Sequence, residues 1–177
     1  MAAFQVCSLS TTTGFATADT NLWPSGSMGI LLLCSLVCGC SGSTSGGMKM
    51  DRFVIVIKSL KGMINSLIGV KNVNRTKLDG QLKTEGNVTS IIVFMGVYLL
   101  IIAIGTIIFA ISMDFKTSLS ASIACMGSVG PGFGDVGSMS NYAGLLGFQK
   151  FVAMIIMLLG RVEIFPMLIA IRSIFHR

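Results

Sequence analysis

A run of twenty-six residues without a charged side chain, Val88 to Met113, constrains the fold of this chain more than any other feature. An α-helix rises about 1.5 Å per residue, so about 20 apolar residues in a helix cross the hydrocarbon core of a bilayer. The run therefore predicts a membrane-spanning helix over residues 88–113. The composition agrees, because 53% of the residues are hydrophobic, 11% are charged and the mean hydropathy is +0.83, values outside the range of soluble domains. We expect an all-α integral membrane protein that crosses the bilayer more than once.

The charges that precede this run indicate its orientation. Between Lys49 and Lys83 the chain carries eight Lys or Arg residues against two acidic ones, Asp51 and Asp79. Short loops rich in Lys and Arg stay on the cytoplasmic side of a membrane, so residues 63–87 are expected to form a cytoplasmic connection. The same clustering accounts for the net charge of +6, and we expect no nucleic-acid partner.

Three further segments follow the uncharged run. Residues 116–127 are moderately apolar but too short to cross a bilayer, which favours a re-entrant half-helix. The glycine loop GSVGPGFGDVG, Gly127 to Gly137, comes next. Residues 150–173 are predicted to return to the cytoplasm as an inner helix with a basic end. Residues 88–177 are thus interpreted as an outer helix, a pore helix, a loop and an inner helix.

The first third of the chain has the same order of segments without an outer helix. A short apolar piece, the loop TTTGFATAD and an apolar helix occupy residues 1–38, and a Gly/Ser/Thr break at Gly39–Gly47 separates that helix from a second one. Irregular backbone is costly in lipid, so the break is expected to lie against protein or a water-filled cavity. We predict about one and a half repeats: a pore helix, filter loop and broken inner helix at residues 1–62, and a complete repeat at residues 88–177.

The two loops have the residue pattern of an ion filter. In potassium-channel filters, T-V-G-Y-G loops present backbone carbonyls that replace the hydration shell of the ion. Glycine adopts the positive φ angles that such a backbone needs, and the preceding half-helix directs the negative end of its dipole at a cation. Asp19 and Asp135 follow the loops, where they would concentrate cations. The candidate filter residues are Thr12, Thr13, Gly14, Phe15, Ser128, Val129, Gly130 and Pro131, with K⁺ bound by the backbone of Thr12, Thr13, Ser128 and Val129.

Arg161 and Glu163 are charged residues inside the predicted inner helix. A charge within a spanning helix is costly and normally faces a bundle interior or a cavity. Arg161 is expected either to form a cationic constriction below the filter or to be neutralised by Glu163 or by carbonyl groups of the Gly39–Gly47 break. The two roles are compatible.

Other ligand-binding motifs fit less well. Gly130-x-Gly132 resembles the start of a dinucleotide fingerprint, but no βαβ unit precedes it and the third glycine position is Asp135. GSTSGGMK lacks the P-loop spacing, because Met48 separates the last glycine from the lysine. The cysteines are expected to be small buried residues rather than metal ligands or disulfides, since the single histidine lies at the far end of the chain. These cysteines are Cys7, Cys34, Cys38, Cys40 and Cys125.

Four motifs in order resemble a known family: TTTGFATAD followed by WP, GCSGSTSGGMK followed by Arg52, GSVGPGFGDVG followed by NY, and MLLGRVEIF. Together they look like the C-terminal half of the Trk-type potassium-uptake translocating subunit, in the superfamily that includes Ktr and plant HKT transporters. The resemblance covers essentially the whole chain. It implies four repeats of outer helix, pore loop and inner helix around one pore, with Gly14 and Gly130 as the filter glycines of the third and fourth repeats.

The resemblance also implies partners and a gate. Full-length chains of such a family usually dimerise in the bacterial cytoplasmic (inner) membrane, transport K⁺, and bind a cytoplasmic nucleotide-binding regulatory subunit. No organic cofactor and no catalytic residue is expected, so the chain is not predicted to be an enzyme. The Gly39–Gly47 break resembles the intramembrane gate loop of the family. The gate residues implied are Gly39, Gly42, Ser43, Thr44, Gly46, Gly47 and Arg161.

Two repeats and one outer helix of the family pattern are absent from this sequence, and two filter segments cannot surround an ion. The sequence therefore predicts half of a potassium permeation pathway, which needs a missing N-terminal half or another pore subunit. The alternative is a non-conducting fragment, or a structural or regulatory membrane subunit that binds partner helices.

Overall fold

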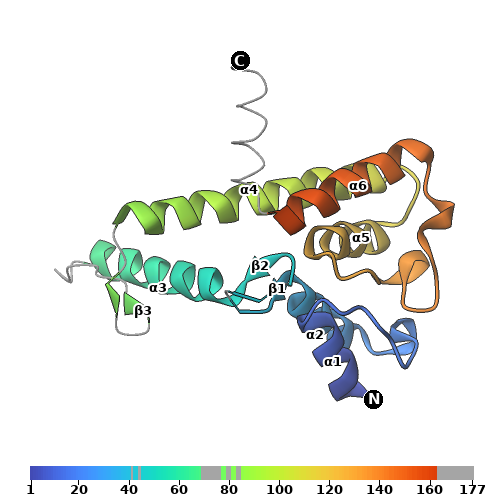
Figure 1. The fold of residues 1–177 in the computed structure, drawn as a ribbon, viewed down its shortest axis with the longest axis horizontal. Coiled ribbons are helices and arrows are strands. Elements are labelled where there is room, and N and C mark those ends of the chain that lie inside the picture. The colour runs from blue at the N-terminus through green and yellow to red at the C-terminus, as the bar shows by residue number, and fades with distance from the viewer. Residues whose placement is uncertain (41, 44, 69–76, 79–80, 83–84, 163–177) are drawn as a thin grey trace.

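The computed structural model describes residues 1–40, 42–43, 45–68, 77–78, 81–82 and 85–162, and within them the chain is mainly helical. Figure 1 shows the order of the helices and the connections between them. The helical content agrees with the predicted fold class. The α-helices of the described residues are α1 (Ala2–Ser10), α2 (Ser25–Leu36), α3 (Met50–Leu67), α4 (Glu85–Phe109), α5 (Phe115–Gly127) and α6 (Gly147–Val162).

Two pairs of two-residue strands accompany the helices, which the all-α prediction lacked. β1 (Val37–Cys38) pairs in parallel with β2 (Met48–Lys49), so the two ends of the Gly/Ser/Thr break lie side by side. β3 (Lys77–Leu78) pairs antiparallel with β4 (Gln81–Leu82), with Leu78 opposite Gln81. The two residues between these strands lie outside the described residues. This pairing gives hydrogen-bond partners to backbone N–H and C=O groups of residues that lie outside the helices.

α4 is the long helix predicted from the uncharged run, but it ends at Phe109 rather than at Met113. The N–H groups of Ser112 and Met113 both donate to the Phe109 carbonyl oxygen, each over 3.2 Å, so a tight turn leads from α4 into α5. An apolar turn has the same hydropathy as an apolar helix, which explains the difference. In the described part of the chain, Val88–Phe109 is the one helix long and apolar enough to span a membrane.

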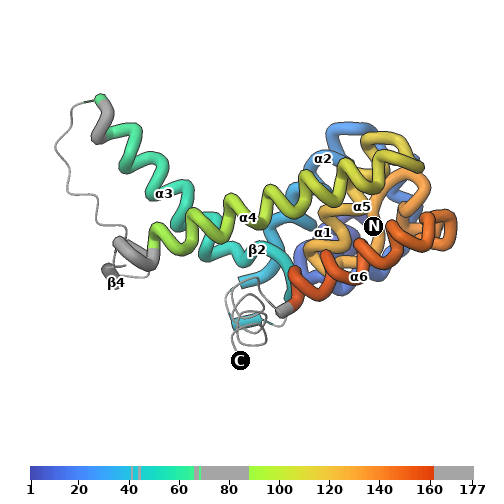
Figure 2. The backbone as a smooth tube through the Cα atoms, turned by 90° about the horizontal axis from the view of Figure 1, so that it is seen from above, coloured from blue at the N-terminus to red at the C-terminus, as the bar shows by residue number. Residues whose placement is uncertain are grey.

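α5 packs between α4 and α6, and these three helices hold the larger apolar core (Figure 2). Gly105 of α4 allows the close approach, because a Cβ there would lie 2.5 Å from Ser122 Oγ of α5 and 2.7 Å from Ile156 Cδ1 of α6. The Ser122 hydroxyl donates to the Ile102 carbonyl oxygen over 2.9 Å, which ties α5 to α4. Nearly all of α5 after its first two residues is therefore buried.

α1 and α2 form a smaller pair that packs against the end of α5 (Figure 1). Only three residues of α1 are buried, whereas α5 is buried along most of its length. A second, smaller apolar core contains residues from α1, α2 and the loop after α5, so it joins the two halves of the described chain. Its buried members are Leu9, Met28, Leu31, Val129 and Phe133.

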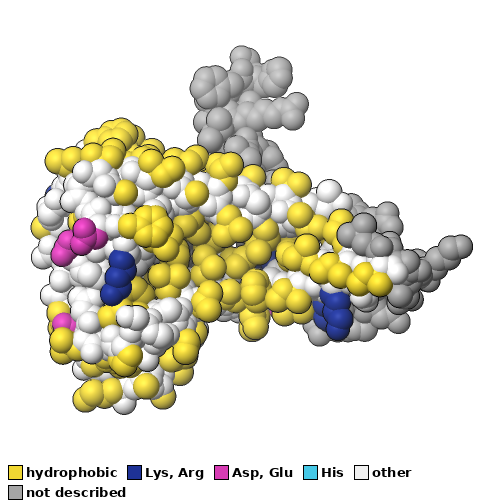
Figure 3. All heavy atoms as spheres, turned by 180° about the vertical axis from the view of Figure 1, so that it is seen from behind, with side chains coloured by type: hydrophobic (Ala, Val, Ile, Leu, Met, Phe, Trp, Pro, Cys, Tyr) yellow, Lys and Arg dark blue, Asp and Glu magenta, His cyan; other side chains and the backbone are white. Residues whose placement is uncertain are grey.

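The outer surface of the described helices is largely apolar. Figure 3 shows hydrophobic side chains in a broad band over one face of the molecule, with few charged side chains among them. Large exposed apolar surfaces mark protein or membrane contacts, so this surface suits a lipid environment. Exposed apolar residues of α4 include Val93, Leu100, Ile104 and Ile107.

Candidate functional site: two glycine loops and a broken helix

The loop after α5 begins with a left-handed residue. Ser128 has φ 52° and ψ 37°, and its N–H donates to the Cys125 carbonyl oxygen over 3.1 Å. The next N–H, of Val129, donates to the Ala124 carbonyl oxygen over 3.0 Å. This pair of bonds is the Schellman ending of a helix. Gly130 follows with φ 106°.

The loop after α1 has the same backbone pattern. Thr12 has φ 58° and donates its N–H to the Leu9 carbonyl oxygen over 3.3 Å, and Thr13 donates to Ser8 over 2.9 Å. Gly14 follows with φ 77°. Each loop therefore consists of a half-helix, a left-handed Ser or Thr, one further residue and a glycine with positive φ. The left-handed Thr12 and Ser128 carry no sequence signal, because glycine and asparagine are the usual residues at this position.

The two loops contact each other at their glycine and valine positions. A Cβ on Gly14 would overlap the Val129 carbonyl oxygen and would lie 3.2 Å from Cδ of Pro131. Gly130, in contrast, has open space where its Cβ would be. Four predicted filter residues, Gly14, Val129, Gly130 and Pro131, are thus brought together, and Gly14 lies at the contact.

The loop carbonyl groups differ in whether they already accept a hydrogen bond. The Phe15 carbonyl oxygen accepts from Ser8 Oγ over 2.6 Å, and the Gly130 carbonyl oxygen accepts from the Tyr142 hydroxyl over 2.8 Å. Among the described residues, no N–H or side chain donates to the loop carbonyls that the sequence predicts as K⁺ ligands. Those carbonyls belong to Thr12, Thr13, Ser128 and Val129.

Beyond the loops, the two halves are tied by residues that the sequence reasoning missed. Asn21 Nδ2 donates to the Gly134 carbonyl oxygen over 3.1 Å, and the Gly134 N–H donates to Asn21 Oδ1 over 2.8 Å. The Thr20 N–H donates to Ser138 Oγ over 3.2 Å, and that hydroxyl donates to the Ala18 carbonyl oxygen over 3.2 Å. Asp19 also contributes, because its carboxylate accepts from the Asn21 N–H over 2.9 Å. No periodic pattern could have identified bonds between residues so far apart in sequence.

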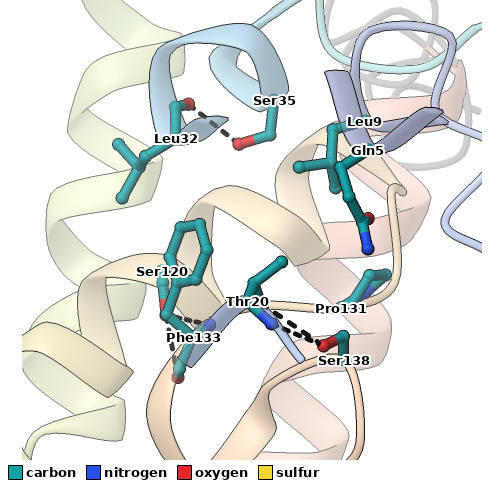
Figure 4. A pocket seen from close by; sticks show the side chains of 10 residues that line it. Gln5, Leu9, Thr20, Leu32, Ser35, Ser120, Pro131, Phe133 and Ser138 are labelled. Carbon is teal, nitrogen blue, oxygen red and sulfur yellow. Dashed lines mark hydrogen bonds between the residues drawn. The ribbon is translucent and has the colours of Figure 1, made fainter. Parts of the chain in front are cut away.

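A small pocket with a mainly apolar lining and several polar side chains lies between α1, α2 and α5, beside the second loop (Figure 4). Its volume of about 10 Å³ is that of roughly one water molecule. Ser120 fixes the part of the loop that lines the pocket. Its Oγ accepts from the Phe133 N–H over 2.9 Å and donates to the Thr117 carbonyl oxygen over 2.9 Å. The polar lining residues are Gln5, Thr20, Ser35, Ser120 and Ser138.

The Gly39–Gly47 break passes directly below the carboxyl end of α5. A Cβ on Gly46 would lie 2.6 Å from the Gly127 carbonyl oxygen, and one on Gly47 would lie 2.8 Å from Cys38 Sγ. The Gly47 N–H donates to the Gly160 carbonyl oxygen of α6 over 3.4 Å. These contacts require glycine, because a side chain would push the break away from α5.

Of the other predicted gate residues in the break, Gly42 and Ser43 are exposed and Gly39 is half-buried. Gly39 lies close to Ser43 and Ser45, since a Cβ on Gly39 would be 2.8 Å and 2.7 Å from their hydroxyl oxygens. Gly42 has φ 88° and open space around it. Thr44 lies outside the described residues.

Arg161 lies in the last turn of α6, next to the contact of Gly160 with the break. Its side chain is exposed, and it makes no hydrogen bond or ion pair with another described residue. Glu163, its predicted partner, lies outside the described residues. No bond from Arg161 to a carbonyl group of the break is present among the described residues. Its pairing with Glu163 and its role as a cationic constriction stay predictions.

The cysteine expectation is correct only in part. Cys38 and Cys125 are buried and Cys34 is half-buried. Cys7 is exposed because it lies on the outer face of α1, and Cys40 is exposed within the Gly39–Gly47 break. Across the described residues no cluster of three or more His, Cys, Asp or Glu side chains could hold a metal ion.

The chain is similar to known transport proteins over its whole length. The sequence profile of the TrkH family, described as cation transport proteins, matches residues 1–176. The Trk system potassium uptake protein TrkG of Escherichia coli is 34% identical over 98% of this chain, and TrkI of Halomonas elongata is 32% identical over 98%. The crystal structure of the potassium transporter TrkH from Vibrio parahaemolyticus covers 98% of the chain at 31% identity with a TM-score of 0.85.

The matches cover only part of each relative. The chain spans 36% of the length of TrkG and of TrkI, and 37% of the TrkH chain in the crystal structure. The expectation that it represents a part of the family's protein is therefore confirmed. The relatives are potassium uptake proteins, which are transporters and not enzymes. From the match along residues 1–176 and the shared fold, this chain belongs to the TrkH family of cation transport proteins.

Proposed function

We propose that this chain supplies part of a transmembrane pathway for K⁺, with the loops Thr12–Phe15 and Ser128–Pro131 as two segments of its selectivity filter. The observation that carries the proposal is the matched backbone of the two loops. Each places a glycine with positive φ after a left-handed residue, and the loops meet at Gly14 and Val129. A Schellman ending is common among helices, but here both loops add a glycine with positive φ two residues after the left-handed one, and the loops contact each other.

The ligands in this proposal are backbone carbonyl oxygens. Filters for K⁺ replace the hydration shell of the ion with such oxygens. The carbonyls of Thr12, Thr13, Ser128 and Val129 accept no hydrogen bond from other described residues, although that of Val129 packs against Gly14. We propose these four oxygens as the ligands of the ion. The end of α5, a half-helix, adds partial negative charge beside them.

The Gly39–Gly47 break is proposed as the gate, with Arg161 beside it. Gly46 contacts the end of α5 and Gly47 is bonded to α6, so a displacement of the break would change the space below the filter. A cationic side chain at this depth would oppose the passage of K⁺.

The architecture and partners complete the proposal. The segments form about one and a half repeats of outer helix, pore helix, loop and inner helix, at residues 1–62 and 88–177, joined by a cytoplasmic connection at 63–87. The remaining repeats come from the rest of a longer protein or from another pore subunit. Such a protein is proposed to lie in the bacterial inner membrane, to dimerise, and to bind a cytoplasmic nucleotide-binding regulatory subunit.

The test is potassium uptake by transport-deficient bacteria. The chain alone is expected not to restore uptake, and coexpression with the missing repeats of a family member is expected to restore it. Gly130→Ala, which changes the backbone but meets open space, should then lower uptake at least about tenfold. Gly29→Ala in α2, also in open space and at an ordinary helical position, is the matched control and should leave uptake unchanged.

Two results would contradict the proposal. Uptake by the lone chain would show that no other pore segment is needed. Uptake that is indifferent to both Gly130→Ala and Gly14→Ala would favour a structural or regulatory membrane subunit instead.

A further inference from the structure

Tyr142 is bonded to the candidate filter from outside the loop. It begins the short 3-10 helix η3 (Tyr142–Gly144), between the second loop and α6. Its hydroxyl donates to the Gly130 carbonyl oxygen over 2.8 Å and also lies beside the thiol of Cys125. Tyr142 is half-buried and Gly130 is exposed, but the Gly130 carbonyl that accepts this bond is directed at Tyr142.

The surroundings hold Tyr142 in this position. Asn141 Oδ1 accepts from the Ala143 N–H over 3.0 Å, and Lys150 Nζ of α6 donates to the Ala143 carbonyl oxygen over 2.9 Å. The ring packs against the core formed by α4, α5 and α6. Burial, with a contribution from Cys125, raises the pKa of Tyr142, so its hydroxyl keeps the proton that it donates.

The other loop has no equivalent of this bond. The Gly14 carbonyl accepts no hydrogen bond from a described residue. The connection from Gly14 to α2 is shorter than the one from Gly130 to α6, and it contains no tyrosine. The two loops therefore differ in whether a tyrosine hydroxyl bonds the carbonyl of the loop glycine, and this difference follows from the sequence.

We propose that Tyr142 is a positioning residue of the filter, which holds the Gly130 carbonyl away from the ion path. The second loop then offers an ion the carbonyls of Ser128 and Val129 but not that of Gly130. This inference rests on the proposed function. The number of coordinating carbonyl groups is one of the two factors held to set K⁺ over Na⁺ selectivity, so release of this carbonyl changes the selectivity of the pathway.

The experiment compares Tyr142→Phe with Tyr98→Phe in the chain coexpressed with the missing repeats. Tyr142→Phe removes only the bonded hydroxyl. Tyr98 is the other of the two tyrosines in the chain, and among the described residues its buried hydroxyl makes no hydrogen bond to either loop. We expect Tyr142→Phe to shift the ratio of K⁺ to Na⁺ uptake by about threefold to tenfold, the equivalent of one hydrogen bond, and Tyr98→Phe to leave the ratio unchanged.

Infrared spectra of the purified chain labelled with 1-¹³C-glycine provide a readout that is independent of transport. In Tyr142→Phe the band of one labelled carbonyl should move to higher frequency, because that carbonyl loses a hydrogen bond, whereas Tyr98→Phe should not move it. An unmoved band would show that the bond is not made and would overturn the inference. A moved band with an unchanged uptake ratio would also overturn it while leaving the proposed function intact. Absence of uptake by the parent protein would overturn the proposed function, and this inference with it.

Discussion

The two glycine loops share one backbone conformation but are held by different surroundings. In both, a left-handed Thr or Ser and a glycine with positive φ follow a half-helix. The second loop leaves a helix that is buried along most of its length and is bonded by Tyr142 and Ser120. The first leaves α1, of which three residues are buried, and its Phe15 side chain is 73% exposed.

This difference separates the local interactions that set the backbone conformation of a loop from the tertiary contacts that hold the loop in place. The helix ending and the glycine that follows it are encoded within about ten residues, because Schellman bonds are local. The rigidity of the loop depends on contacts from distant elements, which the second loop has and the first largely lacks in this chain. Substitutions at matched positions of the two loops should therefore have unequal effects.

The largest expected effect is at the point where the loops meet. Gly14→Ala would place a methyl group into the Val129 carbonyl oxygen at a positive φ, and we expect a loss of more than about 3 kcal/mol in the free energy of unfolding. Gly130→Ala meets open space and should cost about 1–2 kcal/mol, from backbone strain alone. Unfolding of the purified chain in detergent micelles measures both. Equal losses would show that the loops do not meet as described.

The next effect concerns a position that is glycine in only one of the two loops. Gly134 has φ 69°, and a Cβ there would overlap Thr117 Oγ1, so Gly134→Ala should cost about 2–3 kcal/mol. Ala18 occupies the matching place after the first loop, and Ala18→Gly should cost at most about 1 kcal/mol. The same unfolding assay compares the two variants. If Ala18→Gly were the more harmful, the first segment would be the more tightly constrained one.

Sequence reasoning found those parts of the fold that depend on composition and on glycine. The uncharged run located α4, and residues 116–127 differ from α5 by one residue at its start. Gly14 and Gly130 were found because positive φ favours glycine. The end of α4 was misplaced, since turn and helix are equally apolar there.

The remaining features depend on tertiary contacts. Tyr142 bonds to Gly130, and Asn21 bonds to Gly134 across 113 positions of sequence. Asn21 belongs to no periodic pattern, and Tyr142 stands in the NY pair that follows the second loop, but neither position in the sequence indicates the residue to which it bonds. The left-handed conformation of Ser128 was also missed, because serine is not typical of that position and the surrounding core imposes it.

A smaller effect is expected from the serines that bond each loop to a half-helix. Ser120→Ala would leave the buried Phe133 N–H without its partner, at a cost of about 1–2 kcal/mol in the free energy of unfolding. Ser8→Ala removes the bond to the carbonyl of Phe15, an exposed residue that water can reach, and should cost about 0.5 kcal/mol. A cost for Ser8→Ala equal to that for Ser120→Ala would mean that the first loop is as well buried as the second.

The last comparison tests whether the two regions behave as one unit. Asn21→Ala removes both bonds to the Gly134 backbone, but the site is only half-buried and water can replace them, so we expect a loss of about 1 kcal/mol. The more informative consequence of Asn21→Ala is expected in the second loop, far from residue 21 in the sequence. Amide hydrogen exchange should accelerate in residues 133–137, which are distant in sequence, because their backbone loses its anchor.

Asn141→Ala is the matched control for this measurement, since Asn141 bonds only the Ala143 N–H of its own short helix. It should accelerate exchange near residue 143 and leave residues 18–23 unchanged. If Asn21→Ala accelerated exchange only around residues 18–23, the two loops would be adjacent but energetically independent. Faster exchange in both residues 18–23 and residues 133–137 would mean that the hydrogen bonds of Asn21 couple the stability of the two loops.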